Sequence, residues 1–524
     1  MGGATLGYAL ARAGSSVLFL EAGRSSLSED GALKGRYAEL WFPRPEAPND
    51  SHRDLLARAG RYVDPVVDVS KPRRRSFIPF IGAGTGGSTA LYGMALERFF
   101  PADFAPRRHY PEAGESTLPD SWPISYDDLV PYYEEAEALF GVRGTRDPLR
   151  GDEPYASGLR APPPTSPGNA ALTRRLAERG LTPYRLPAAC EFVAGCRGCQ
   201  GYLCPRPCKN DAARICLAPA LESHGAALLD RCHVQSVAEE GGRVTEVVAI
   251  HEGKQLVFKG DVVVLAAGAL NSPAILLRSR AARHPQGVAN ESGLVGRNLM
   301  RHFVDLYALK PGADCPPDVN VKEIAFNDFY LRDGRKFGSV QSFGDLPPAS
   351  VVVAAMADEL RAGPVPLLAP LVRAASPILR RVIAGKLAGR IILASLLEDL
   401  PYAENRVSVP EDGGSRAIHV TYRISPHDER RIAEFRSILG KLFADLSPFV
   451  MKQAENNERI AHACGTCRFG DDPATSVLDR WNRAHGVENL YVVDSSFFPS
   501  SAGTNPSLTI AANALRVARQ LLTS

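Results

Sequence analysis

Two short apolar runs in the chain each end at an acidic residue. Residues 17–20 are followed by Glu21, and residues 490–493 are followed by Asp494. Short runs of four apolar residues that include β-branched side chains are typical of buried strands. In an open α/β sheet, ligands bind beyond the carboxyl ends of such strands. We therefore expect both acids to lie near a ligand.

Two other segments have the apolar spacing of helices. Residues 2–14 form a run of small and aliphatic side chains, and residues 507–518 follow Asn505 and Pro506. Asn suits the cap of a helix and Pro suits its first position. The positive end of the second helix would face the same region as the strand at residues 490–493. It could stabilise negative charge there.

The first residues match half of a dinucleotide-binding fingerprint. Gly2 and Gly3 lead into the first helix, and Glu21 stands about 20 residues later, where the fingerprint has its ribose-binding acid. The strand and the two glycines that should come earlier are missing. We therefore expect the sequence to be truncated, with roughly 10 to 40 further residues ahead of Met1 in the natural protein. Loss of that central strand should weaken nucleotide binding.

The middle of the chain predicts further strands. Residues 244–250 and 255–259 alternate apolar and polar side chains, which favours a β-hairpin. Residues 261–269 favour a buried strand that ends in a glycine turn. Residues 405–409 and 418–422 favour strands of a sheet that covers the ligand.

Residues 364–397 mix apolar and basic side chains. The pattern predicts a pair of amphipathic helices covering a sheet. A helix lying on a membrane or a lid over an apolar substrate is the alternative, but Pro370 and Pro377 interrupt any long apolar face.

Length and composition narrow the class of protein. A chain of 524 residues is too long for one core, so we expect two or more domains. The net charge of +3 gives no argument for nucleic acid binding, and no uncharged apolar run reaches the length of a membrane span. We expect a cytoplasmic protein, with export left open because the start is incomplete.

Three residues near the end carry candidate chemistry. His462 has the unperturbed pKa of a general base near neutral pH, and Asn505 and Asp494 follow it. Each has a simpler explanation, since His462 could be a core histidine, Asn505 a helix cap and Asp494 a turn former. A glycine-rich segment at residues 81–94 would let the backbone approach a flat ligand closely.

Taken together, these motifs resemble the glucose–methanol–choline (GMC) oxidoreductases, FAD enzymes that oxidise alcohols. The likeness runs from residue 2 to about residue 520. The motifs that carry it, in order, are Glu21 after the glycine turn, Gly86-Gly87-Ser88 with Gly93-Met94, Gly268 to Pro273, His462-x-x-Gly465-Thr466 and Asn505-Pro506.

The resemblance implies roles for particular residues. His462 would be the catalytic base and Asn505 its partner, with hydride passing to FAD. Tyr92 departs from the Asn that many members have before the Gly-Met pair. The cofactor-binding residues that the resemblance implies are Gly2, Gly3, Glu21, Gly86, Gly87, Ser88, Gly93, Met94, Gly268, Asp494 and Pro506.

The resemblance also predicts the fold and its division. The fold would be α/β, with a Rossmann-like FAD-binding domain that lacks its first strand and an α+β substrate domain whose antiparallel sheet is covered by helices. The FAD-binding domain would comprise residues 1–100, 186–305 (with a cysteine-rich insertion at 190–232) and 456–524, and the substrate domain 101–185 and 306–455.

The predicted activity is FAD-dependent oxidation of a CH–OH group to an aldehyde or ketone. The substrate would be a sugar-like, polyol or aminoglycoside-like alcohol, and the electrons would go to oxygen or to an external acceptor. Two alternatives remain: a flavoprotein with other chemistry, such as an amine oxidase or desaturase, or a truncated and non-catalytic remnant.

Seven of the ten cysteines lie between residues 190 and 232. Structural disulfides, zinc or buried thiols, and an iron–sulfur cluster are three competing interpretations. The last follows from a resemblance to catalytic subunits of some bacterial flavin-dependent sugar dehydrogenases. The candidate metal ligands are Cys196, Cys199, Cys204 and Cys208.

Overall fold

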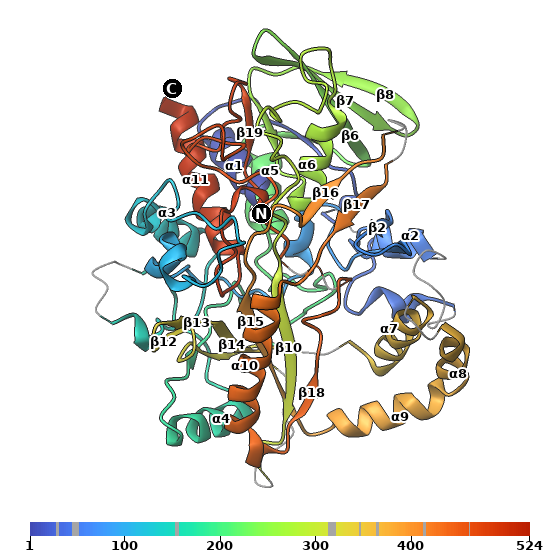
Figure 1. Cartoon of the computed structure of the whole chain (residues 1–524), viewed down its shortest axis with the longest axis vertical. Helices are drawn as coiled ribbons and strands as arrows, with labels where there is room; N and C mark the ends of the chain where they lie inside the picture. Colours follow the sequence, from blue (N-terminus) through green and yellow to red (C-terminus); the bar gives the residue numbers. More distant parts are fainter. Residues whose placement is uncertain are drawn as a thin grey trace.

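A computed structural model gives the fold of the chain. Its upper half in Figure 1 contains the first and last helices, and its lower half contains a large antiparallel sheet. The structure describes residues 1–27, 31–43, 52–151, 157–196, 198–312, 321–344, 347–362, 366–411, 416–458, 460 and 462–523.

Two pairs of parallel strands form the predicted nucleotide-binding part. β1 (Leu18–Leu20) pairs with β5 (Ala227–Leu229), and β19 (Leu490–Val492) pairs with β9 (Val263–Leu265). Among the described residues, no strand joins one pair to the other. Both acid-terminated apolar runs therefore form strands, as predicted.

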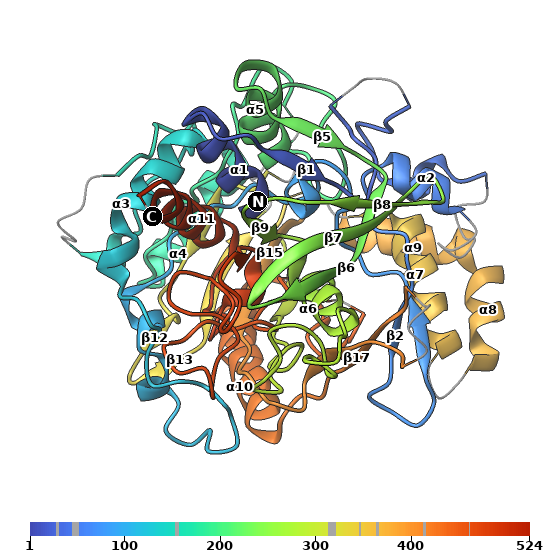
Figure 2. The same ribbon diagram turned by 90° about the horizontal axis from the view of Figure 1, so that it is seen from above.

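Three helices start beside these strands. α1 (Gly2–Arg12) packs along α11 (Ser507–Thr523), and Figure 2 shows the two helices side by side. α6 (Gly268–Arg278) follows β9. The strand predicted over residues 261–269 is shorter than expected, because Gly268, with φ of 84°, already begins α6.

A three-stranded antiparallel sheet lies at the top of Figure 1. It consists of β6 (Cys232–Glu240), β7 (Arg243–His251) and β8 (Lys254–Phe258). The predicted hairpin is confirmed as β7 and β8. Its turn residues, Glu252 and Gly253, both have positive φ.

A six-stranded sheet forms the substrate half. Every strand pair in it is antiparallel, and β10 lies next to β15, which lies next to β14. The strands in spatial order are β18 (Phe449–Met451), β10 (His302–Leu309), β15 (Ile391–Glu398), β14 (Gly338–Ser342), β11 (Ile324–Phe326) and β4 (Tyr184–Arg185).

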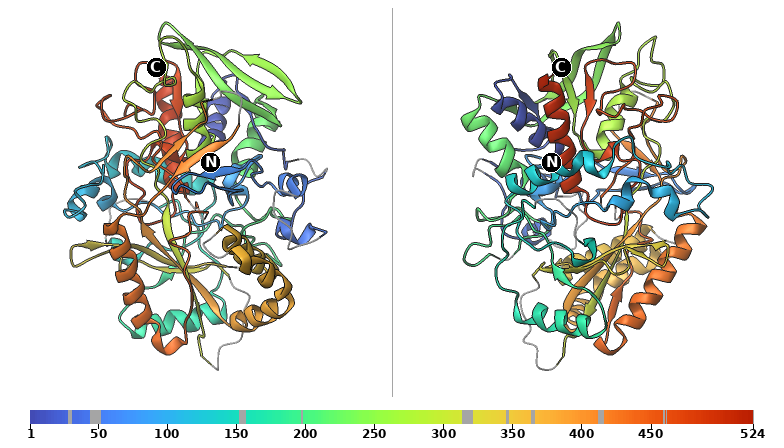
Figure 3. Two further views of the ribbon diagram at one scale, coloured as in Figure 1. Left: turned by 45° about the vertical axis from the view of Figure 1, so that its right-hand side comes forward. Right: turned by 90° about the vertical axis from the view of Figure 1, so that its left-hand side faces the viewer.

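Helix α10 (Pro426–Leu442) lies along one face of this sheet (Figure 3). Its side chains Ile432 and Phe435 belong to the same buried apolar cluster as Phe303 of β10 and Leu393 of β15. Burial of large apolar side chains is the main stabilising term for such a layer. The predicted α+β substrate domain is therefore present.

The strands predicted over residues 405–409 and 418–422 are both present. β16 (Arg406–Ser408) and β17 (Ile418–Thr421) form a four-stranded sheet with β2 (Val66–Asp68) and β3 (Arg75–Phe77). β17 pairs in parallel with β2. Both predicted strands are thus confirmed. Their pairing could not be predicted, because β2 lies in a segment whose sequence has no clear periodicity.

The helices within residues 349–362 and 366–387 pack on one another at one side of the molecule (Figure 1). The predicted amphipathic pair is thus part of a three-helix group, and residues from Ile391 onward are strand β15. Leu371 and Ile378 remain exposed. The remaining α-helices are α2 (Arg53–Arg58), α3 (Tyr126–Leu139), α4 (Pro167–Glu178), α5 (Ala218–Ser223), α7 (Ala349–Ala362), α8 (Ala369–Ala374) and α9 (Ser376–Leu387).

No helix in the described part of the chain combines the length and the apolar character that a membrane crossing requires.

Candidate active site

His302 and His462 meet at the start of strand β10. His302 is the first residue of β10 and is 2% exposed, whereas His462 lies in the loop after β18 and keeps an accessible edge. Their Nδ1 atoms are 2.7 Å apart. His462 has φ of 60°, a left-handed conformation that is unusual for a residue with a side chain and that often occurs at functional sites.

The partners of the two rings assign their hydrogens. His302 Nε2 lies 2.9 Å from the carbonyl oxygen of Ala502 and 3.2 Å from that of Ser501. Carbonyl oxygens only accept, so Nε2 of His302 carries the hydrogen and its Nδ1 is the acceptor. His462 must then donate from Nδ1. Its Nε2 therefore has a free lone pair, and no described residue hydrogen-bonds to it.

Both rings are held in the neutral form. Burial lowers the pKa of His302. Burial first, and then the electrostatic influence of His302 and of Lys322, lower the pKa of His462 well below its usual value. His462 is therefore an unprotonated base at neutral pH.

Asn505 is oriented by a second strand of the same sheet. Its Oδ1 accepts a hydrogen bond of 2.8 Å from Nε2 of Gln341, which belongs to β14. The NH₂ group of Asn505 is thus left to donate to a ligand. Gln341 Oε1 is buried and has no hydrogen-bond partner in the part of the chain that the structure describes.

Asn505 does not cap helix α11. The helix begins at Ser507, and the carbonyl oxygen of Pro506 accepts a hydrogen bond from the backbone N–H of Ile510. Pro506 therefore occupies the cap position, one residue later than the sequence predicted. Capping is thus excluded as the explanation for Asn505.

Helix α1 starts against the ends of β19 and β9. A Cβ atom added to Gly2 would lie 1.9 Å from the carbonyl oxygen of Val493, and one added to Gly3 would lie 2.7 Å from Cβ of Ala266. Only glycine permits this close approach. The structure thus brings the first two candidate cofactor-binding glycines to the predicted strand ends.

Asp494 joins β19 to α6. One carboxylate oxygen accepts from the backbone N–H of Gly268 at 2.9 Å and from the hydroxyl of Ser272. The other accepts from the backbone N–H and hydroxyl of Ser496, at 2.9 and 2.6 Å. Asp494 and Gly268 therefore lie together, and the carboxylate is saturated by protein donors.

Glu21 lies beside the glycine-rich segment. Its Oε1 accepts from the backbone N–H groups of Gly23, at 2.8 Å, and Gly84, at 3.0 Å. Burial raises its pKa, and these hydrogen bonds oppose the effect. Glu21 thus positions the segment that contains the other candidate glycines.

The glycine-rich loop turns sharply at Gly86 and Gly87, whose φ angles are 83° and 53°. Such angles strain any other residue. The loop closes on itself, because Gly82 N–H donates to the hydroxyl of Ser88. A Cβ on Gly87 would meet no atom within 4 Å, so its backbone faces open space.

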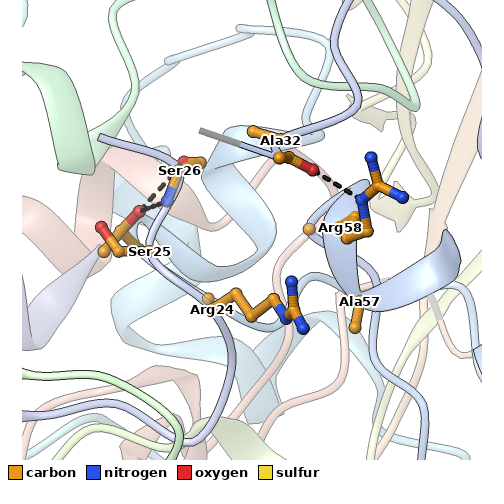
Figure 4. Close-up of a pocket in the computed structure, with 10 residues that line it drawn as sticks. Arg24, Ser25, Ser26, Ala32, Ala57 and Arg58 are labelled. Atoms are coloured by element: carbon orange, nitrogen blue, oxygen red, sulfur yellow. Dashed lines mark hydrogen bonds between the residues drawn. The ribbon is translucent and has the colours of Figure 1, made fainter. Parts of the chain in front are cut away.

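A pocket of about 300 Å³, counting the open space at its mouth, lies next to this loop. Figure 4 shows Ser25 and Ser26 on one side and Ala57 and Arg58 on the other. Gly84, which donates to Glu21, is part of the lining. The pocket therefore opens beside the carboxylate that was predicted to bind the ribose.

Comparison with known sequences identifies the family. Two sequence models described as GMC oxidoreductase match the chain, one at residues 17–304 and the other at residues 401–514. The chain belongs to the GMC oxidoreductase family. The resemblance inferred from the motifs is thereby confirmed, and the protein is an FAD-dependent alcohol oxidoreductase.

The relatives of this GMC oxidoreductase include characterised enzymes. It is 31% identical over 477 residues to the 6'''-hydroxyparomomycin C oxidase of Streptomyces lividus, covering 84% of this chain and 79% of that one. It is 32% identical over 472 residues to the paromamine 6'-oxidase of Streptomyces fradiae, with the same coverage. The crystal structure of pyridoxine 4-oxidase from Mesorbium loti matches with a TM-score of 0.61 and 20% identity, covering 100% of this chain and 97% of that one.

The residues present fit FAD. The first turn of α1 and the glycine loop offer backbone N–H groups of the kind that bind phosphate. Like Gly87, Gly268 has nothing within 4 Å of a built Cβ, so both leave room for a close ligand. Glu21 supplies the acid that a ribose requires.

Met94 and Tyr92 connect this loop to the cysteine-rich insertion. Tyr92 donates its hydroxyl to the carbonyl oxygen of Asn210 at 2.6 Å, so it anchors the insertion in place of the Asn found in many members. Met94, which follows Gly93, shares a buried apolar cluster with Cys190 and Cys208. The insertion therefore packs against the predicted flavin contacts.

The insertion gathers its thiols into one cluster. Sulfur atoms of Cys190, Cys196 and Cys208 all lie within 4.8 Å of one another. Cys204 is 3.4 Å from Cys208, and Cys199 hydrogen-bonds Cys204. The nine cysteines of the described residues are unpaired thiols. The structure thus brings together the four predicted ligands, although Cys199 lies farther from the central three, and it adds Cys190.

Sequence reasoning missed four polar residues of the site. His302 and Gln341 hydrogen-bond the two candidate catalytic side chains, and Lys322 and Gln200 lie beside Gly93. The position of His302 at the start of a strand gave no signal on its own. Lys322 and Gln200 can be identified only from the structure, in which their polar ends are buried.

Proposed function

We propose that this enzyme oxidises a CH–OH group of a polyhydroxylated alcohol, with His462 as the base that removes the hydroxyl proton. The hydrogen-bond chain from Ala502 through His302 to His462 carries the proposal. It leaves Nε2 of His462 unprotonated and directed away from its protein partner. A positioned base of this kind typically contributes 10²- to 10⁴-fold to the rate.

Asn505 would hold the substrate hydroxyl. Its amide oxygen is already occupied by Gln341, so its NH₂ group donates to the substrate oxygen. As the proton moves to His462, negative charge develops on that oxygen. The Asn505 donor and the N-terminal end of α11 would stabilise this charge.

FAD, when bound, supplies the acceptor for the hydride that leaves the same carbon. The residues that would hold it are Gly2, Gly3, Glu21, Gly86, Gly87, Ser88, Gly93, Met94, Gly268, Asp494 and Pro506.

The substrate class rests on the relatives. The names of two of them specify aminoglycosides, which are polyhydroxylated amino sugars. We infer a sugar-like, polyol or aminoglycoside-like alcohol for this chain. The test is anaerobic mixing of the FAD-loaded enzyme with a panel of such alcohols. Bleaching of the flavin absorbance supports the proposal, and failure of every alcohol to bleach it contradicts the proposal.

We also propose that the cysteine cluster holds a thiolate-bound iron–sulfur cluster that passes electrons to an external acceptor. Grouped thiolates are the ligands of such clusters and of zinc. Met94 packs against the cysteine cluster, so an iron–sulfur centre there would lie beside the flavin. Without the cluster, oxygen is the electron acceptor that we expect.

Metal analysis of anaerobically purified protein tests this second proposal. We expect iron and acid-labile sulfide in the wild type, and loss of both in Cys208→Ser. Cys232→Ser is the control, because Cys232 is buried in strand β6, outside the group of thiols. Zinc without iron, or no metal at all, would contradict the iron–sulfur assignment.

A further inference from the structure

Lys322 is a buried cation for which the described residues offer no partner. Its side chain is 9% exposed, and no described residue accepts a hydrogen bond from it or forms an ion pair with it. Burial lowers its pKa to about 8, so it remains mostly protonated at neutral pH. A buried ammonium group without an acceptor is costly. Within the described part of the chain nothing completes the arrangement, which leaves room for an acceptor supplied by a bound ligand.

Gln200 presents the complementary group at the same place. Its Oε1 is buried and has no hydrogen-bond partner among the described residues. A Cβ atom added to Gly93 would lie 2.6 Å from Gln200 Oε1 and 3.0 Å from Lys322 Nζ. The glycine loop, the cysteine-rich insertion and the substrate half thus converge on one point, and a side chain at Gly93 would fill it.

This point belongs to the active site. The strand after Lys322, β11, pairs with β14, which carries Gln341 and through it orients Asn505. The charge of Lys322 also acts on the ring of His462. Lys322 is therefore close enough to a substrate held by the His462 and Asn505 pair to contact another part of it.

We propose that Lys322 and Gln200 form a subsite for a second hydroxyl group of the substrate. This inference rests on the proposed function and extends it. A hydroxyl group can accept from the ammonium and donate to the amide oxygen, so it satisfies both orphaned groups. A carboxylate satisfies only Lys322, and an ammonium group satisfies only Gln200 and is repelled by Lys322.

The subsite makes the enzyme select a neutral polyol or sugar over a simple alcohol. It also disfavours an amino group next to the reacting carbon, so an amino sugar must present a hydroxyl at this position. A site that hydrogen-bonds a substrate hydroxyl rejects analogues that lack it, because its own polar groups are left unpaired.

Four three-carbon primary alcohols test the subsite: glycerol, 1-propanol, glycerate and 3-amino-1-propanol. In the wild-type holoenzyme, we expect kcat/KM for anaerobic flavin reduction to be about 10- to 100-fold higher for glycerol than for 1-propanol, as hydrogen bonds to a charged group imply. Lys322→Met and Gln200→Leu should each shrink this ratio towards one. The ratio compares two substrates within one enzyme, so it cancels any effect of the variant on His462. Lys254→Met, on the exposed strand β8, is the control that should change nothing.

Calorimetric binding of the same four compounds to the oxidised holoenzyme provides a second readout, which does not need turnover. Weaker binding of glycerol, but not of 1-propanol, in Lys322→Met supports the subsite even if none of the four is oxidised. Tighter binding of glycerate than of glycerol would overturn the hydroxyl assignment. Equal losses of binding affinity for glycerol and for 1-propanol in Lys322→Met would mean that Lys322 has a structural role instead.

Discussion

Replacing His462 with Ala is expected to slow alcohol-driven flavin reduction by about 10²- to 10⁴-fold. The variant lacks the ring-nitrogen lone pair that His462 offers at this position in the described structure, so the hydroxyl proton must pass to water. His462 hydrogen-bonds His302, which is not among the residues that would hold FAD, so the flavin should stay bound. Stopped-flow reduction under anaerobic conditions, with the flavin content measured in parallel, checks both statements.

His251→Ala is a suitable control, because His251 ends strand β7 in the three-stranded sheet, away from the site. It should reduce at the wild-type rate. Reduction of the His462→Ala enzyme within about fivefold of the wild type would remove His462 from the role of base, since general-base catalysis contributes more than that. The second histidine, His302, would not replace it, because both of its ring nitrogens are already engaged.

The ligand-facing strands could be predicted because their signals are local. The strand at residues 490–493 can be predicted by counting consecutive apolar residues. The place of Asp494 near a ligand follows from the general rule for open α/β sheets. The structure confirms the strand as β19. It also shows why an acid follows the strand. The carboxylate of Asp494 accepts a hydrogen bond from the backbone N–H of Gly268 and so fixes the start of α6.

The partners of the catalytic residues could not be predicted, because they depend on pairing between distant strands. His302 and Gln341 come from β10 and β14, which are joined through β15 some 50 to 90 residues away in sequence. Their side chains approach His462 and Asn505 only after this sheet has formed. Likewise β17 pairs with β2, and no local pattern specifies that register.

The composition of the cysteine cluster could not be predicted fully either, because it also depends on how the chain folds back. Spacing suggested Cys196, Cys199, Cys204 and Cys208 as ligands, whereas the three closest thiols include Cys190. The backbone of Cys190 pairs with Lys209, which folds the insertion back on itself. Lys209 then donates to two carbonyl oxygens and holds the insertion against the glycine loop.

Replacing His302 with Leu is expected to lower the rate of flavin reduction on the order of 10²-fold, by removing the acceptor that fixes the tautomer of His462. A histidine base needs a partner that fixes which ring nitrogen carries the hydrogen. Losing that partner lowers the rate strongly, although the ring itself remains. His302→Gln retains an acceptor oxygen and a donor and should recover most of the rate. The two variants differ little in size, so their comparison isolates hydrogen bonding from packing.

The pH profile separates this role from a structural one. The pKa of His462 is lowered by burial and then by His302, so removing His302 should raise it. A rate that requires the neutral base is lost as the pH falls through that pKa. The acid limb of the profile should therefore move to higher pH in both His302→Leu and His302→Gln, because neither replacement retains the electrostatic effect of the His302 ring. A lower rate with an unchanged acid limb in both variants would mean that His302 only supports the packing around β10.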